Sequence, residues 1–137
     1  MRKNKVKLSD ILDFSADEIE ILLNVSESRA REIHALADFQ QVPSIGINFA
    51  KDLISMGFYS IDDLLGKDGA DLTDLHEKHI GYKTDPCVED QFRLIVYFAK
   101  TKDYSKNWWD FTSERKAFRA EFGYPKDRPE KNWTEIL

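Results

Sequence analysis

The residues best suited to chemistry lie in one short segment, VPSIGINFAKDL, at residues 42–53. Glycine at position 46 permits a tight bend that exposes successive amide hydrogens, and the helix expected after it adds the positive end of its dipole. Such a bend can hold a backbone phosphate without reading base sequence. We therefore predict a nucleic-acid-binding site formed by Ser44, Ile45, Gly46, Ile47, Asn48 and Lys51. In this site Lys51 supplies positive charge.

The segment resembles a helix-hairpin-helix motif, in which a tight glycine-containing turn joins two helices. In such a motif Ala50 is small because two helices cross closely, and Leu53 fills the core beneath. Ser44 stands where the usual pattern has its first glycine, and Asn48 stands where DNA-binding hairpins commonly carry lysine. Lys51 follows one turn later, so we expect any phosphate binding to be weak.

A weak internal repeat precedes this segment. When the chain is aligned with itself at a shift of 20 residues, Asn24–Ile33 matches Ser44–Leu53. Small and aliphatic residues, then an alanine, a basic and an acidic residue, recur at the same places in both segments. Ser26 takes the place of Gly46, so we interpret the first copy as a degenerate hairpin with a doubtful phosphate site. The alternative is a coincidence between two similar helix starts.

Three other side chains could bind zinc, namely His76, His79 and Cys87. A structural site needs four ligands, and the fourth here would have to be Asp74 or Asp85. We favour two exposed histidines and a packed, unreactive thiol, because no nucleophile motif surrounds the cysteine. No P-loop, dinucleotide-binding or zinc-protease motif occurs either. We predict no metal, no cofactor, no catalytic residue and no enzymatic activity.

Composition excludes several classes of protein. The chain has 137 residues, of which 42% are hydrophobic and 33% charged, as expected of one globular domain. Its net charge of −5 excludes a polycation that coats nucleic acid or anionic lipid by bulk charge. The single cysteine excludes an internal disulfide. No apolar run approaches the roughly 18 residues of a membrane span, and no signal peptide is evident, so we predict a cytoplasmic protein.

Helices must position these residues, because no stretch alternates apolar and polar side chains as a strand would. Local signals delimit the helices. Ser15 and Glu18 have the spacing of a capping box, flanked by Phe14 and Ile19 as a hydrophobic staple, and Asp85 can cap a helix that opens with Pro86. Gly57 and Gly81 can end helices, Glu89 and Arg93 are spaced as a helical ion pair, and apolar spacing marks the remaining helices. We predict an all-α bundle of about six or seven short helices, SAM-domain-like, around the hairpin. The first expected helix starts after Ser15, the second spans 28–38, and the third runs from the VPSIG segment to Gly57. The fourth starts after Ser60, the fifth spans 70–79, the sixth begins at Pro86 and the last spans 112–122.

Charged and aromatic residues divide the chain into three parts. Residues 1–7 form a predicted basic tail, and residues 8–102 form the predicted helix-hairpin-helix domain. Residues 103–137 hold many of the aromatic residues, and we expect this extension to pack on the domain. Trp108 and Trp109 could instead stack on bases of single-stranded nucleic acid, but we favour an anchoring role.

Several motifs between residues 39 and 101 combine into a family resemblance. They are PSIG with Ala50 and Leu53, then GFYSIDDLLGKD, then Asp85, Cys87 and Val88 ahead of a helix that ends in VYFA. The combination looks like the small bacterial pathogenicity-locus family, whose members are often labelled helix-hairpin-helix or mitomycin-resistance proteins. The resemblance implies an α-helical, hairpin-type domain. It implies no reaction, substrate or catalytic residue.

Two functions follow as hypotheses. The first is weak, sequence-independent DNA binding through the phosphate-binding turn, in an auxiliary role. The second is a protein–protein interaction module that uses the acidic body or the tryptophan-rich tail, with a purely structural hairpin. A fold alone does not decide between them.

Overall fold

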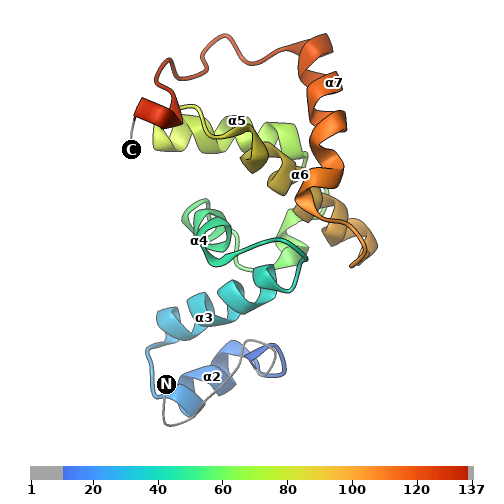
Figure 1. Cartoon of the computed structure of the whole chain (residues 1–137). Helices are drawn as coiled ribbons and strands as arrows, with labels where there is room; N and C mark the ends of the chain where they lie inside the picture. Colours follow the sequence, from blue (N-terminus) through green and yellow to red (C-terminus); the bar gives the residue numbers. More distant parts are fainter. Residues whose placement is uncertain (1–10, 136–137) are drawn as a thin grey trace. The chain divides into compact units, whose positions relative to one another are not determined.

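The computed structural model describes residues 11–135, so the predicted basic tail at residues 1–7 lies outside the described residues. The described residues form helices and no strand; one isolated parallel bridge joins Lys83 and Asn132 (Figure 1). The all-α prediction is confirmed. The α-helices are α2 (Ala16–Leu23), α3 (Glu27–Gln40), α4 (Ile47–Ser55), α5 (Gly69–Ile80), α6 (Pro86–Thr101) and α7 (Thr112–Phe122), and the 3₁₀ helices are η1 (Ile61–Leu64), η2 (Trp108–Phe111) and η3 (Trp133–Glu135).

The chain divides into two units, Met1–Asp63 and Leu64–Leu137, called here the N-terminal and C-terminal units. In the N-terminal unit, α2 starts with the predicted capping box: the Ser15 hydroxyl accepts from the Glu18 amide, and the Glu18 carboxylate accepts from the Ser15 amide. Phe14 packs against the buried cluster that contains Ile19, as expected of a hydrophobic staple.

Helices α3 and α4 are joined by the turn at residues 41–46. Ala50 and Leu53 on α4 are fully buried, which agrees with the sequence pattern. The helix stops at Gly57, whose φ of 95° is the left-handed conformation that glycine adopts most readily. Ser60 and Asp63 also cap each other, but the helix between them is the single 3₁₀ turn η1.

In the C-terminal unit, α5 and α6 pack against each other. Asp85 caps α6, Pro86 is its first residue, and Gly81 ends α5 in the left-handed conformation, all as predicted. Helix α6 buries the apolar side chains Phe92, Leu94, Ile95, Val96, Phe98 and Ala99. No helix in residues 11–135 is both long and apolar enough to span a membrane.

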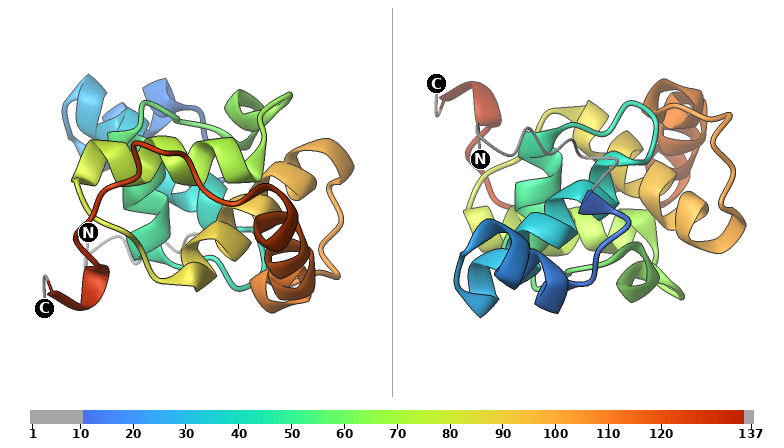
Figure 2. Two further views of the ribbon diagram at one scale, coloured as in Figure 1. Left: turned by 90° about the horizontal axis from the view of Figure 1, so that it is seen from above. Right: turned by 90° about the horizontal axis from the view of Figure 1, so that it is seen from below.

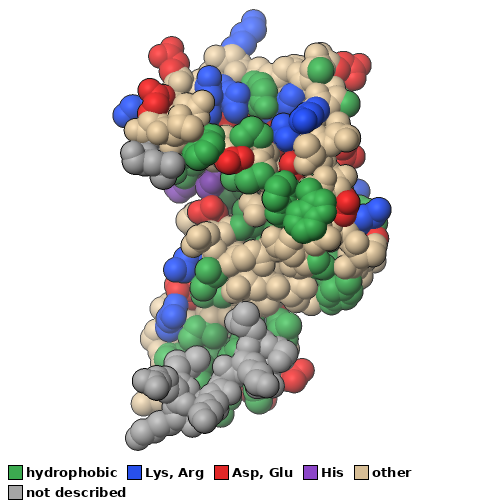
Figure 3. Space-filling view, viewed as in Figure 1, with side chains coloured by type: hydrophobic (Ala, Val, Ile, Leu, Met, Phe, Trp, Pro, Cys, Tyr) green, Lys and Arg blue, Asp and Glu red, His purple; other side chains and the backbone are tan. Residues whose placement is uncertain are grey.

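Helix α7 contacts α6 although it buries none of its own residues. After α7, residues 124–132 run back along α5 in the left view of Figure 2, where this segment is coloured red. Ion pairs hold it there, including Arg128 to Glu77 at 2.8 Å and Lys78 to Asp127 at 2.6 Å. Basic and acidic side chains accordingly lie next to one another on the face of this unit seen in Figure 3.

Candidate nucleic-acid interface

The turn before α4 has an unusual backbone. Ser44 has a φ of 64°, in the left-handed region that glycine occupies without cost, which explains why the usual pattern has glycine there. The Ser44 hydroxyl donates to the carbonyl oxygen of Pro43 at 2.5 Å. Gly46 is extended, with φ −101° and ψ −178°, and α4 begins at the next residue.

The amide hydrogens of this turn differ in what they bind. The Ile45 amide donates to the carbonyl oxygen of Val42 at 3.2 Å, and Ile45 is buried, so it offers no free donor. Gly46, Ile47 and Asn48 are exposed. Their amides donate to no other residue in the described part of the chain, and no side chain caps the start of α4. The turn therefore offers three amide donors rather than the longer series expected.

Lys51 lies one turn further along α4 and is exposed. It lines a shallow hollow of about 220 Å³ together with Glu32, Ile54 and Ser55. The Glu32 carboxylate already pairs with Arg29. Lys51 forms no ion pair with any residue in 11–135, so its charge is available beside the turn.

The repeat seen in the sequence recurs in the backbone. Asn24 has a φ of 52° and Ser44 a φ of 64°, and each lies two residues before an extended N-cap, Ser26 and Gly46 respectively. The alanines that follow, at positions 30 and 50, are both fully buried. Two independent helix starts would not be expected to share these features at one constant spacing.

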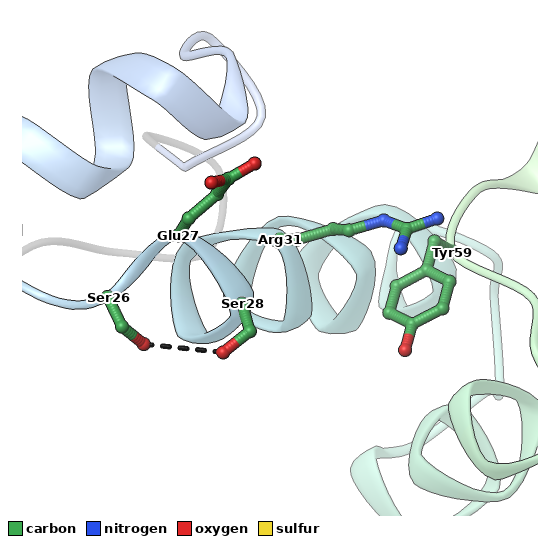
Figure 4. Close-up of a pocket in the computed structure, with 5 residues that line it drawn as sticks. All are labelled: Ser26, Glu27, Ser28, Arg31 and Tyr59. Carbon is green, nitrogen blue, oxygen red and sulfur yellow. Dashed lines mark hydrogen bonds between the residues drawn. The ribbon is translucent and has the colours of Figure 1, made fainter.

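The first copy differs from the second at its helix start, drawn in Figure 4. The Ser26 hydroxyl caps α3 by accepting from the Arg29 amide at 3.2 Å. It also lies 3.4 Å from the Ser28 hydroxyl, the contact dashed in Figure 4. Arg31 lies over the ring of Tyr59 at 3.7 Å, and both line a hollow of about 450 Å³. The repeat aligned Arg31 with Lys51, but no local signal pointed to Tyr59, which is 28 residues away in sequence (31 to 59).

The possible zinc ligands lie in different surroundings. His79 is exposed, but His76 is buried, with its ring 5.6 Å from that of Phe92, so the expectation of two exposed histidines was wrong for His76. Position 76 faces α6, and the sequence pattern did not reveal that contact. In residues 11–135, no three histidine, cysteine or acidic side chains are grouped as a metal site would need.

Cys87 is half-buried near the start of α6. Burial, followed by the neighbouring Asp85 carboxylate, raises the pKa of its thiol to about 11. Only the thiolate is nucleophilic. At pH 8 we expect Cys87 in the folded chain to react with iodoacetamide on the order of 100-fold more slowly than in urea, as followed by mass spectrometry. Equal rates in the two states would contradict the packed-thiol interpretation.

Comparisons with known proteins give one finding. A search of curated proteins and a search of solved structures each return no significant match. The family model described as "Pathogenicity locus" matches residues 32–117. The match covers the turn before α4, α4 with Lys51, α5, α6 and the first half of α7, which is more than half of the chain. The chain therefore belongs to the pathogenicity-locus family.

Proposed function

We propose that the protein binds DNA weakly and without sequence preference, through the turn at Ser44–Asn48. The amides of Gly46, Ile47 and Asn48 carry this proposal, because these residues are exposed and their amides donate to no acceptor among residues 11–135. A phosphate oxygen is such an acceptor. We place this activity in the bacterial cytoplasm, with which a single free cysteine is compatible.

Charge at the turn supports a phosphate ligand. The turn lies at the positive end of α4, where an anion is stabilised. Lys51 adds a full positive charge one turn away. Contacts of this kind go to the backbone of the nucleic acid and carry no base information, so sequence-independent binding follows.

The same surroundings limit the affinity. The whole chain carries −5, and one lysine beside three amides can neutralise few phosphates. We expect a dissociation constant of about 0.1 mM or weaker at physiological salt. An affinity this low fits an auxiliary role beside another DNA-binding component.

A single substitution at Ile47 tests the role of one backbone amide without changing the rest of the turn. Ile47 is the first residue of α4, a position that favours proline because its amide has no partner within the helix. Ile47→Pro removes one donor, while Ile47→Ala keeps it and loses only an exposed side chain. We expect Ile47→Pro to weaken duplex binding several-fold, and Ile47→Ala to leave it unchanged, in fluorescence anisotropy titrations at several salt concentrations.

Lys51→Glu provides a second test of the same site. It should weaken binding and lower the slope of log affinity against log salt by about 1. If the wild-type chain binds no duplex, or if proline and alanine at position 47 behave alike, DNA binding through the turn is refuted. The interaction module that uses the acidic body or the tryptophan-rich tail then becomes the better hypothesis.

A further inference from the structure

The C-terminal unit contains a polar hollow of about 210 Å³ where three of its segments meet. One wall is a face of α6, whose lining residues follow helical spacing at positions 93, 96, 97 and 100. The other walls are the loop at the start of α5 and the junction of η2 with α7. Apart from the α6 face, the hollow is lined by Lys67, Asp68, Gly69, Phe111 and Glu114.

The lining of the hollow carries three cations, Lys67, Arg93 and Lys100, and two carboxylates, Asp68 and Glu114. Arg93 donates through Nε and Nη2 to Glu89, at 3.1 and 2.9 Å, and through Nη1 to Glu114 at 3.4 Å. The Asp68 carboxylate accepts from the Asp71 amide and so occupies the start of α5. The start of that helix is therefore not the anion-binding element of the hollow.

Two of these cations have no ion-pair partner among the described residues. Lys67 and Lys100 are exposed, and neither forms an ion pair with any residue that the structure describes. They come from different segments, one from the loop before α5 and one from the last turn of α6. Two ammonium groups at one hollow repel each other, and a shared anion would relieve that repulsion.

The surroundings hold these two segments in place. A Cβ at Gly69 would lie 2.8 Å from the Arg93 Cα, so the loop that carries Lys67 approaches the α6 backbone closely. The Tyr97 ring packs on Phe111 at 5.5 Å, and its hydroxyl donates to Asp103 at 2.6 Å. The hollow is thus bounded by packed and hydrogen-bonded parts of the unit.

We propose that this hollow binds a phosphate group through Lys67 and Lys100. Its volume is below the roughly 300 Å³ at which pockets for whole small-molecule ligands begin, so it suits one phosphate rather than an entire nucleotide. The site is separate from the Ser44–Asn48 turn and does not depend on it. The phosphate could belong to a nucleic-acid backbone or be free in solution.

The test begins with inorganic phosphate, added at constant ionic strength and followed by amide chemical shifts in ¹H–¹⁵N spectra. Saturable shifts are expected around Lys67 and Lys100, with affinity about tenfold lower in Lys67→Gln and in Lys100→Gln. Lys116→Gln is the matched control, because Lys116 is an exposed lysine of the same unit that does not line the hollow. Absent or non-saturable shifts, or equal effects of all three variants, would overturn the proposal.

A second titration with a short DNA duplex identifies the source of the phosphate. A lower salt slope in Lys67→Gln and Lys100→Gln, by about 1 each, would assign the site to a nucleic-acid backbone. Saturable phosphate binding without any duplex effect would assign it to free phosphate, and either result supports the site. Ile47→Pro should retain the phosphate-induced shifts at the hollow, so a failure of the turn and a failure of the hollow are distinguishable.

Discussion

The free energy of unfolding is expected to fall by about 3–5 kcal/mol when Arg119 is replaced by methionine. The Arg119 guanidinium donates to Glu89 and to Asp74, each at 2.9 Å. The side chains of Arg119 and Glu89 are only 7% and 3% exposed. Methionine keeps much of the apolar stem but leaves Oε1 of the buried Glu89 without a donor and the carboxylate with Arg93 as its remaining cation, which is costly.

The surroundings of Asp74 support this estimate. Burial raises the pKa of Asp74, and the hydrogen bond and charge of Arg119 act in the opposite direction. Removing the guanidinium leaves the effect of burial unopposed there. The same guanidinium donates through Nη1 to the carbonyl oxygen of Gly123 at 3.1 Å, so the end of α7 loses a contact as well.

Urea unfolding followed by circular dichroism measures the change. The matched control is Arg29→Met, which breaks the ion pair of Arg29 with Glu32, whose side chains are 52% and 44% exposed. Exposed pairs of this kind contribute about 1 kcal/mol or less. A loss at Arg119 no larger than the loss at Arg29 would contradict the claim that buried ion pairs hold α7 in place.

The signals that predicted the helices are all local in sequence. The Ser15 and Glu18 box, the Asp85 cap and the Gly81 stop each involve residues within a few positions of one another. The hydrogen bonds that fix such ends are formed within one turn, so spacing alone identifies them. Apolar spacing, which is also a local signal, located α7 at its observed bounds.

The ion pairs that hold the C-terminal segment could not be predicted in this way. Arg119 and Glu89 are 30 residues apart, and Arg128 and Glu77 are 51 apart. Spacing on one helix predicted only the pair of Glu89 with Arg93, at four residues. One signal was present: Glu89 belongs to a helix that is otherwise largely apolar, and buried carboxylates need cations from elsewhere.

For the turn before α4, too, some features follow from local sequence and others from the rest of the chain. The position of the turn before α4 follows from the local pattern, but the pattern placed the tight bend at Gly46, whereas the left-handed residue is Ser44 and Gly46 is extended. Which amides are free depends on the path of the chain just before the turn, where the carbonyl oxygen of Val42 accepts from Ile45. Similarly, the burial of His76 depends on its packing against Phe92 of α6.

Gly69→Ala is expected to lower the free energy of unfolding by about 1–3 kcal/mol through overpacking. Gly69 is the first residue of α5 and is buried against α6. A Cβ there would lie 2.7 Å from the Cγ, 2.8 Å from the Cα and 3.0 Å from the amide nitrogen of Arg93. The side-chain carbon could move aside, but the backbone atoms belong to a buried helix, so the start of α5 must shift.

Gly46→Ala is the control with the same change in side chain. A Cβ at Gly46 would meet nothing within 4 Å, and its φ of −101° suits any residue. We expect a change within about 1 kcal/mol there, including the small preference for glycine over alanine at an N-cap. Thermal and urea unfolding of both variants measure the difference. If the two substitutions cost the same, the close approach of α5 to α6 at Gly69 is not what requires glycine there.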